Sequence, residues 1–384
     1  MKHFAKLIFL LLALGIAVGV QCQPPRGPLA FPYRINADKT VTFQYYSHTA
    51  TDVKISAQCE KAPVNLTKNA SGMWSVTIGP VKPDIYPYNF IVDGIQVMDP
   101  ANEYYFPNER FKGSLLDVPG DSPLIHSMQD VPHGTVTYEY YPSAEGTTGS
   151  LVVYTPPRYE KNTTKKYPVF YLISGTTDTE ETFFKVGRAN LILDNLIAQG
   201  KANPMILVMP NGNVAAQIAD QKGGLKPGDP MGRESAEAVV RSKQFEDDLM
   251  KNIIPYVEKN YRVVANSQNR AIGGFSRGGG QTLRAAFGNM DKFSYVCAYS
   301  SYLTPQEIES SYKYLVDNPK RTNKMYKLLW VSVGNEDFLY KQTVEYMDYL
   351  KAKKINFKNL ITTGGHTWMN VKTYLAATAP LLFK

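Results

Sequence analysis

The stretch Arg270-Ala271-Ile272-Gly273-Gly274-Phe275-Ser276-Arg277-Gly278-Gly279-Gly280 decides the fold. Residues 270–274 form an apolar run typical of a strand, and residues 281–287 favour a helix. A serine enclosed by two glycines at such a turn is the pattern of a nucleophile elbow, which raises Ser276 above the sheet at the N-terminus of a helix. The helix dipole favours a developing negative charge at that point. The alternative is a glycine-rich turn without catalysis, which the strand–turn–helix context disfavours.

Apolar runs of the same kind recur through the second part of the chain. They span residues 151–154, 169–173, 205–209, 295–299 and 328–333, and helical stretches such as residues 245–261 separate them. Nearly continuous apolar runs are expected of strands that are buried on both faces, and their alternation with helices predicts a mostly parallel sheet. We therefore predict an α/β-hydrolase domain, a three-layer sandwich, over residues 134–384.

A nucleophilic serine needs a histidine base, and the chain has only five histidines. His366 is the only one that follows Ser276, and it stands on a loop that contains Gly364 and Gly365. In this fold the acid lies between the serine and the histidine along the chain. Asp337 follows the apolar run 328–333 and is preferred, while Glu336 stays open. Three further acids occupy apparent loop or helix positions and are weaker alternatives: Asp291, Asp317 and Asp348.

An oxyanion hole requires two backbone N–H groups beside the nucleophile. Arg277, directly after Ser276, is expected to supply one of them. The turn Ser174-Gly175-Thr176 follows the apolar run 169–173, and we expect Thr176 to supply the other.

The three cysteines and five histidines lack the spacing of a zinc site, so we expect no metal and no cofactor.

Residues 27–118 follow a different pattern. Short segments with period-two alternation, such as residues 41–46, 53–56, 74–78 and 86–92, are separated by turn residues. This pattern predicts a separate β-sandwich domain of the immunoglobulin-like type. Residues 119–133, which contain prolines and a glycine, are interpreted as a linker.

Residues 27–118 contain an ordered set of motifs: Gly72-Met73-Trp74, Pro80, Tyr86, Tyr88, Phe90, Val92-Asp93-Gly94 and Asp99-Pro100. In this order they resemble the family 48 carbohydrate-binding module. The resemblance implies a module that stands ahead of a carbohydrate-active catalytic domain. Flat rings stack on sugars, and the candidates are Trp74, Tyr86, Tyr88 and residues 104–106. The alternative is that these aromatic side chains fill the sandwich core, and we prefer it for Trp74 and Phe90.

The N-terminus has the pattern of an export signal. Lys2 and Lys6 precede the apolar residues 7–20, a run too short to cross about 30 Å of hydrocarbon. We expect residues 1–22 to be a signal peptide and the protein to be secreted or periplasmic, without a membrane span. A lipid anchor on Cys22 is disfavoured, because Gln21 stands where a small residue is preferred.

The chain has a net charge of +8, but its lysines and arginines are spread along the sequence without runs, so no nucleic-acid partner is expected.

Further motifs surround the elbow in the second part of the chain: Tyr171-Leu172-Ile173-Ser174-Gly175, Met209-Pro210-Asn211-Gly212, Ile254-Pro255-Tyr256-Val257-Glu258, Asp337-Phe338-Leu339-Tyr340 and Gly365-His366. Together with the elbow they resemble carbohydrate esterase family 1, the group of feruloyl and acetylxylan esterases, which is also similar to S-formylglutathione hydrolases of the esterase D type. Ser174 departs from the pattern, because many relatives have a histidine before the oxyanion glycine.

This resemblance implies a serine esterase that releases a hydroxycinnamate such as ferulate from a plant cell-wall polysaccharide such as arabinoxylan. Trp368 and Tyr340 would flank the aromatic acyl group, or would pack the core instead. Acetylxylan esterase and enterochelin-type esterase are the enzymatic alternatives, and a non-catalytic glycan-binding protein is a less favoured one. The oligomeric state and the question of whether the N-terminal domain touches the active site stay open.

Overall fold

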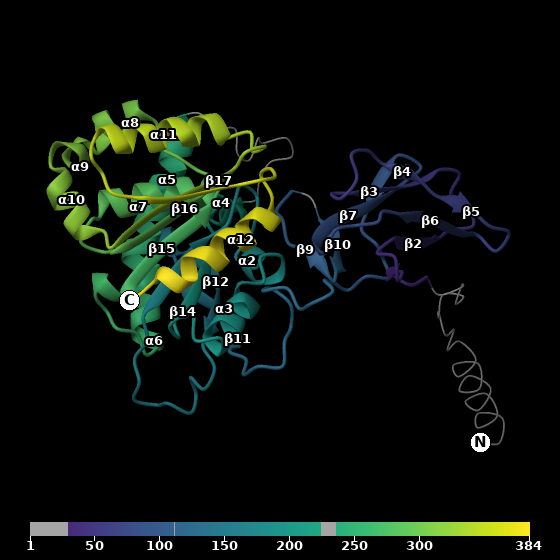
Figure 1. Ribbon diagram of the computed structural model, residues 1–384, viewed down its shortest axis with the longest axis horizontal. Coiled ribbons are helices and arrows are strands. Elements are labelled where there is room, and N and C mark those ends of the chain that lie inside the picture. The colour runs from purple at the N-terminus through teal and green to yellow at the C-terminus, as the bar shows by residue number, and fades with distance from the viewer. Residues whose placement is uncertain (1–29, 111, 224–235) are drawn as a thin grey trace, which may run out of the picture.

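The computed structural model describes residues 30–110, 112–223 and 236–384. It has a β-rich N-terminal part and a larger α/β part, which lie side by side (Figure 1). The predicted signal peptide, residues 1–22, and Cys22 lie outside the described residues. Within the described ranges, no helix combines the length and the apolar character that a membrane crossing demands.

The N-terminal part consists of two sheets around one core. The first sheet has the order β1-β2-β6-β5, with bounds Tyr33–Ile35, Val41–Tyr46, Met73–Ile78 and Thr67–Lys68. The second has the order β4-β3-β7-β10-β9, with bounds Val64–Asn65, Val53–Ala57, Asp84–Val92, Gly113–Val118 and Tyr105–Phe106, and β8 (Ile95–Val97) pairs with β7. All of these pairings are antiparallel. The immunoglobulin-like type and the domain limits 27–118, 119–133 and 134–384 stay predictions.

Alternation along the strands creates the core of this part. In β2, Val41 and Phe43 are fully buried while their neighbours are partly exposed, because successive side chains point to opposite faces. Of the aromatic residues considered for sugar stacking, Trp74, Tyr86 and Tyr88 are buried in this core, as is Phe90. The core-filling alternative therefore holds for these four side chains, whereas Tyr104 is 53% exposed and Phe106 is buried in another cluster.

One eight-stranded sheet forms the centre of the α/β part. Its order is β11-β12-β14-β13-β15-β16-β17-β18. The bounds in that order are Thr135–Pro142, Thr148–Thr155, Ile206–Pro210, Val169–Ile173, Arg270–Phe275, Tyr295–Tyr299, Leu328–Gly334 and Lys358–Thr362. The first three strands pair antiparallel, and the pairs from β14 to β18 are parallel. The prediction of a mostly parallel sheet is confirmed.

Helices cover both faces of this sheet (Figure 1). One face packs against α2 (Thr182–Lys185), α3 (Ala189–Ala198) and α12 (Trp368–Thr378). The helices on the other face are α4 (Val214–Gly223), α5 (Ala236–Asp248), α6 (Ile254–Asn260), α7 (Arg277–Gly288), α8 (Pro305–Ser311), α9 (Lys313–Asp317), α10 (Pro319–Met325) and α11 (Tyr340–Ala352). Strand side chains alternate between the two cores, so Val169 and Tyr171 face one core and Phe170 faces the other. The predicted three-layer arrangement is confirmed.

The two parts of the chain share a hydrophobic core. Ile85, Phe106 and Leu115 of the N-terminal part belong to the same buried cluster as the side chains of α3 and α12. An ion pair also crosses this boundary, since the Lys372 ammonium contacts the Asp84 carboxylate. The N-terminal part is therefore packed onto the α/β part and is not tethered through a linker alone.

Candidate active site

Ser276 stands at the sharp turn between β15 and α7. Its backbone has φ 55° and ψ −119°, a left-handed conformation that costs about 1–3 kcal/mol in a residue other than glycine. A Cβ atom on Gly274 would lie 2.4 Å from the Gly278 carbonyl, and one on Gly278 would lie 2.2 Å from the Ile173 oxygen. Both positions therefore require glycine, as the sequence pattern indicates.

The imidazole of His366 is held by one carboxylate. His366 Nδ1 lies 3.0 Å from Asp337 Oδ1 and 2.8 Å from Oδ2. Burial raises the pKa of the Asp337 carboxyl, but hydrogen bonds from His366 and from the Leu339 N–H outweigh burial and hold the pKa below its ordinary value. Glu336, the alternative acid, is exposed. The geometry therefore favours Asp337 as the partner of His366.

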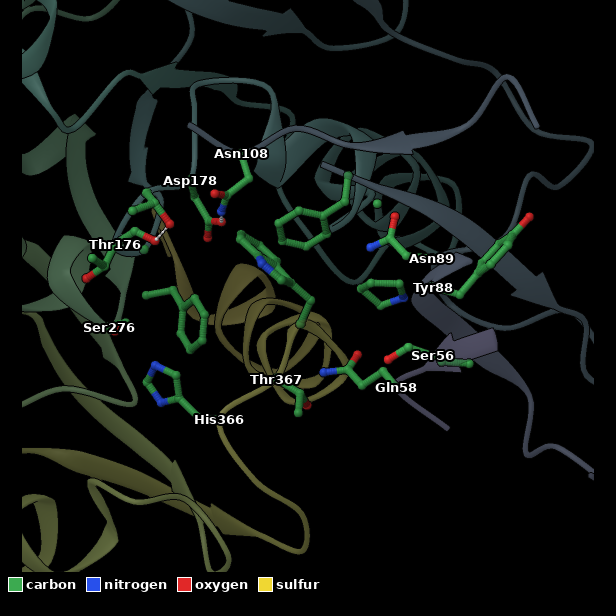
Figure 2. A pocket seen from close by; sticks show the side chains of 18 of the residues that line it. Ser56, Gln58, Tyr88, Asn89, Asn108, Thr176, Asp178, Ser276, His366 and Thr367 are labelled. Atoms are coloured by element: carbon green, nitrogen blue, oxygen red, sulfur yellow. Dashed lines mark hydrogen bonds between the residues drawn. The ribbon is translucent and has the colours of Figure 1, made fainter. Parts of the chain in front are cut away.

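Ser276 and His366 line the same pocket, which has a volume of about 700 Å³. Figure 2 shows both side chains at one end of it, beside Thr176. A pocket of this size falls within the range of small-molecule sites. The structure therefore brings together the predicted nucleophile, the predicted base and one predicted oxyanion donor.

The second predicted donor, Arg277, is the first residue of α7. The first N–H groups of a helix have no partner within the helix, so the backbone here presents hydrogen-bond donors beside Ser276. The side chain of Arg277 holds the opposite loop, because its Nη2 donates to the Gly175 carbonyl at 3.0 Å. A side chain at Gly175 would be tight, since its Cβ would lie 3.0 Å from Asp178 Oδ2.

Two phenylalanine rings flank the imidazole. The ring centroids of Phe275 and Phe338 each lie 4.5 Å from the centroid of His366. Phe275 is buried, whereas Phe338 is 71% exposed and lines the pocket. Sequence reasoning missed Phe338. Its only signal is its position next to Asp337, because exposure of a large apolar side chain cannot be read from local sequence.

The two residues predicted to flank an acyl group occupy different places. Trp368 lines the pocket but is 6% exposed, and its ring packs against Phe275 and Phe183 with centroid distances of 5.4 Å and 4.9 Å. Tyr340 begins α11 and packs against the core on the other face of the sheet. It is not among the residues that line this pocket. Phe338 therefore occupies the position that we had expected for Tyr340.

The far end of the pocket belongs to the N-terminal part. Polar side chains from its second sheet and from the turn after β3 line this end: Ser56, Gln58, Glu60, Asn89 and Gln96. Figure 2 shows Ser56, Gln58 and Asn89 on the side of the pocket opposite Ser276. The question left open by the sequence is thereby answered, because the N-terminal part forms one wall of the pocket. No local motif predicts this, since the wall depends on packing between distant segments.

A buried carboxyl group lies beside the predicted oxyanion loop. Asp178 is 5% exposed, and its Oδ1 accepts a hydrogen bond of 3.1 Å from Asn108 Nδ2. Burial raises the pKa of Asp178 to about 7, against the opposing effects of the Asn108 hydrogen bond, the Arg277 charge and a hydrogen bond from Trp368. A perturbed acid in a pocket is a feature of functional sites. Sequence reasoning did not single out this residue.

Comparisons with known proteins agree with this geometry. Residues 145–370, more than half of the chain, match the family described as "Putative esterase". The chain is 30% identical over 330 residues to an "Endo-1,4-beta-xylanase/feruloyl esterase" of Xylanibacter ruminicola, which is 83% of this chain and 41% of that protein. An "Endo-1,4-beta-xylanase Y" of Acetivibrio thermocellus is 26% identical, and the match spans 23% of its length. The chain thus spans less than half of either curated relative.

Two solved structures are similar over different extents. The feruloyl esterase module from Clostridium thermocellum, complexed with sinapinate, is 26% identical with a TM-score of 0.55, and the match covers 69% of this chain and 92% of that one. The enterobactin esterase from Shigella flexneri has a TM-score of 0.61 over 91% of this chain and 95% of that one. It is 14% identical, so that likeness concerns the fold alone. Because residues 145–370 match its model, the chain belongs to the family described as "Putative esterase" and is an enzyme of the serine esterase type.

Proposed function

We propose that this chain is a secreted member of carbohydrate esterase family 1 that hydrolyses hydroxycinnamoyl esters, such as feruloyl esters, on a plant cell-wall polysaccharide such as arabinoxylan. The observation that carries the proposal is the pocket in which Ser276, His366 and the exposed ring of Phe338 meet. The name of the relative from Xylanibacter ruminicola supports it, because it pairs feruloyl esterase with xylanase.

The proposed reaction is a two-step acyl transfer. His366 accepts the proton of the Ser276 hydroxyl as its oxygen attacks the ester carbonyl carbon, and Asp337 orients the imidazole through Nδ1. The tetrahedral oxyanion receives hydrogen bonds from the N–H groups of Arg277 and Thr176. Collapse breaks the ester bond, and the imidazolium gives its proton to the leaving alcohol. Water then repeats the sequence on the acyl-enzyme and releases the acid.

The two ends of the pocket suit the two halves of such an ester. At the catalytic end, Phe338 offers a flat apolar surface to an aromatic acyl group, and offset stacking of rings is favourable. At the other end, the amides of Gln58 and Gln96 offer hydrogen bonds to a sugar. A small acetyl group would leave the ring of Phe338 uncovered, so the exposed ring favours the hydroxycinnamate over the acetylxylan alternative.

A panel of esters tests the proposal. We expect wild-type protein to release ferulate from methyl ferulate and from feruloylated arabinoxylan fragments, and to release little acetate from acetylated xylan. Ser276→Ala should abolish turnover, and equal rates for the two proteins would refute the serine mechanism. Release of acetate alone would support the acetylxylan esterase alternative. Turnover of a dihydroxybenzoyl-serine ester alone would support the enterochelin-type alternative.

Two further features belong to this proposal. We propose export through a signal peptide at residues 1–22, supported by the charges of Lys2 and Lys6 ahead of the apolar run. We also propose that residues 27–118 are a domain related to the family 48 carbohydrate-binding module. Recovery of the native protein from the periplasm or medium tests the first point. Binding of xylo-oligosaccharides to Ser276→Ala, measured by calorimetry, tests the second.

A further inference from the structure

The predicted oxyanion loop, residues 175–178, contains a strained residue. Thr177 has φ 62°, and a β-branched side chain in the left-handed region is a rare outlier. Such conformations persist only where surrounding contacts over-determine them. The loop also carries Thr176, whose N–H is a proposed oxyanion donor, so its conformation sets the position of that donor.

The N-terminal part supplies contacts to the second half of this loop, at Thr177 and Asp178. Residues 107–109 follow β9 and lie along the loop, so that Asn108 and Asp178 form an antiparallel bridge. The Glu109 N–H donates to the carbonyl of the strained Thr177 at 2.7 Å. Figure 2 shows Asn108 directly beside Asp178, near Thr176 and above Ser276.

The side chain of Asn108 adds a specific bond to this backbone contact. Its Nδ2 donates to Asp178 Oδ1 at 3.1 Å, and both residues are buried. At the end of the loop, the Thr182 hydroxyl donates to the Pro107 carbonyl at 3.1 Å. Residues 107–109 therefore bond to the loop at two successive residues and to the first residue of α2.

From these contacts we infer that Asn108 is a positioning residue, through which the N-terminal part holds residues 175–178 in the conformation that directs the Thr176 N–H toward the oxyanion. This inference rests on the proposed function of Ser276 as the nucleophile. Asn108 acts through Asp178 and the loop, and not on the reacting atoms. The pKa of Asp178, raised by burial, agrees with a carboxyl group that is enclosed by this contact.

The test uses the full chain, p-nitrophenyl acetate as substrate, and Asn108→Ala. Complete loss of one oxyanion donor costs about 10²–10³ in kcat, so a displaced donor is expected to cost about tenfold, with KM within twofold of wild type. An aryl boronic acid, which forms a tetrahedral adduct with the serine, should bind about tenfold more weakly. The product acid ferulate should inhibit as before, because it does not need the oxyanion hole.

Tyr105→Phe is the matched control. It removes the hydroxyl that bonds to Glu181 across the same boundary, at 3.1 Å, but it does not touch residues 175–178. We expect its kcat and its boronate affinity to equal those of wild type. If both variants lose kcat equally, or if Asn108→Ala keeps wild-type kcat and boronate affinity, the inference is overturned.

A further measurement makes the test independent of the choice of substrate, and a further variant covers the case in which Asn108→Ala does not fold. Hydrogen exchange of peptides that cover residues 174–179 should be faster in Asn108→Ala than in wild type and unchanged in Tyr105→Phe, whose lost bond is to Glu181 outside this range. Unchanged exchange in Asn108→Ala would refute the inference even if no ester were turned over. If Asn108→Ala does not fold, Asn108→Ser, with its shorter polar side chain, is measured in the same assays.

Discussion

Asp337 and Glu336 are adjacent in sequence, yet only the first accepts a hydrogen bond from His366. We expect Asp337→Asn to lower kcat by about 10³–10⁴ with little change in KM, because an amide favours the wrong imidazole tautomer and cannot stabilise the imidazolium. Steady-state kinetics on methyl ferulate measure this. Glu336→Gln is the control and should stay within twofold of wild type. The reverse outcome would exchange the roles of the two acids.

Asp178 makes the stability of the fold depend on pH. Its pKa is raised to about 7, so between the ordinary value of 3.8 and about pH 7 the folded chain holds a proton that the unfolded chain releases. This contribution is fully present below 3.8 and is lost as the pH rises through about 7.

We therefore expect the free energy of unfolding of wild type to fall between pH 5 and pH 8 by at least about 1 kcal/mol more than that of Asp178→Asn, which cannot titrate. Urea unfolding of both proteins at the two pH values measures the difference. Parallel pH dependence of the two proteins would contradict the assignment.

The site residues that could be identified from the sequence either belong to a local motif or are the only residue of their type in the required part of the chain. Ser276 has the elbow pattern, and His366 is the only histidine after it. Phe338 and Asn108 have no such signal. Phe338 matters because it is exposed at the pocket, and Asn108 matters because it meets Asp178 from 70 residues away in the chain. Such properties arise from tertiary packing, which no single stretch of sequence contains.

At the scale of elements, the junction of β13, β15 and α7 depends on backbones that approach very closely. Gly278→Ala would place a Cβ 2.2 Å from the Ile173 carbonyl oxygen, which no side-chain movement can relieve. We expect loss of at least about 100-fold in kcat/KM together with lowered thermal stability, because the first turn of α7 must move away from the sheet.

Gly280→Ala, in the same helix, is the matched control. Its Cβ would meet the end of the Arg284 side chain at 3.0 Å and Ser301 Oγ at an ordinary contact distance of 3.6 Å, and no backbone atom. Alanine is also favoured over glycine in a helix. We expect wild-type activity and equal or higher thermal stability for this variant. Calorimetry and turnover of methyl ferulate report both variants. Equal damage from both substitutions would mean that helix propensity, and not the close approach at Gly278, governs this junction.

The elements themselves were well predicted where their pattern is strong. β13, Val169–Ile173, has the bounds expected from its sequence, and β15 extends one residue further than expected. The stretch 245–261 was expected to be helical throughout, and it is divided between α5, a π-helical turn at Leu249–Ile253 and α6. A π-helical turn contains one residue more than an α-helical turn, and the apolar pattern of residues 245–261 does not show where such a residue is inserted. The π-helical turn could therefore not be predicted from the sequence.

At the scale of the whole molecule, the shared core predicts a single cooperative unit. Phe106 of β9 is buried with side chains of α3 and α12, so its loss affects both parts. We expect Phe106→Ala to lower the free energy of unfolding by about 3 kcal/mol, within one calorimetric transition. Phe90→Ala, in the core of the N-terminal part alone, is the companion variant and should shift the same single transition. Two transitions, of which only one moves, would show that the parts unfold independently.

The tryptophans give this protein a set of optical reporters. Its three tryptophans are Trp74 in the N-terminal core, Trp330 in β17 and Trp368 beside the pocket. With Trp74 and Trp330 replaced by phenylalanine, Trp368 would be the only indole that emits. Its hydrogen bond to Asp178 couples that emission to the ionisation of the carboxyl group. The fluorescence of a single residue would then follow both the protonation of the site and the arrival of an aromatic acid in solution, without any added label.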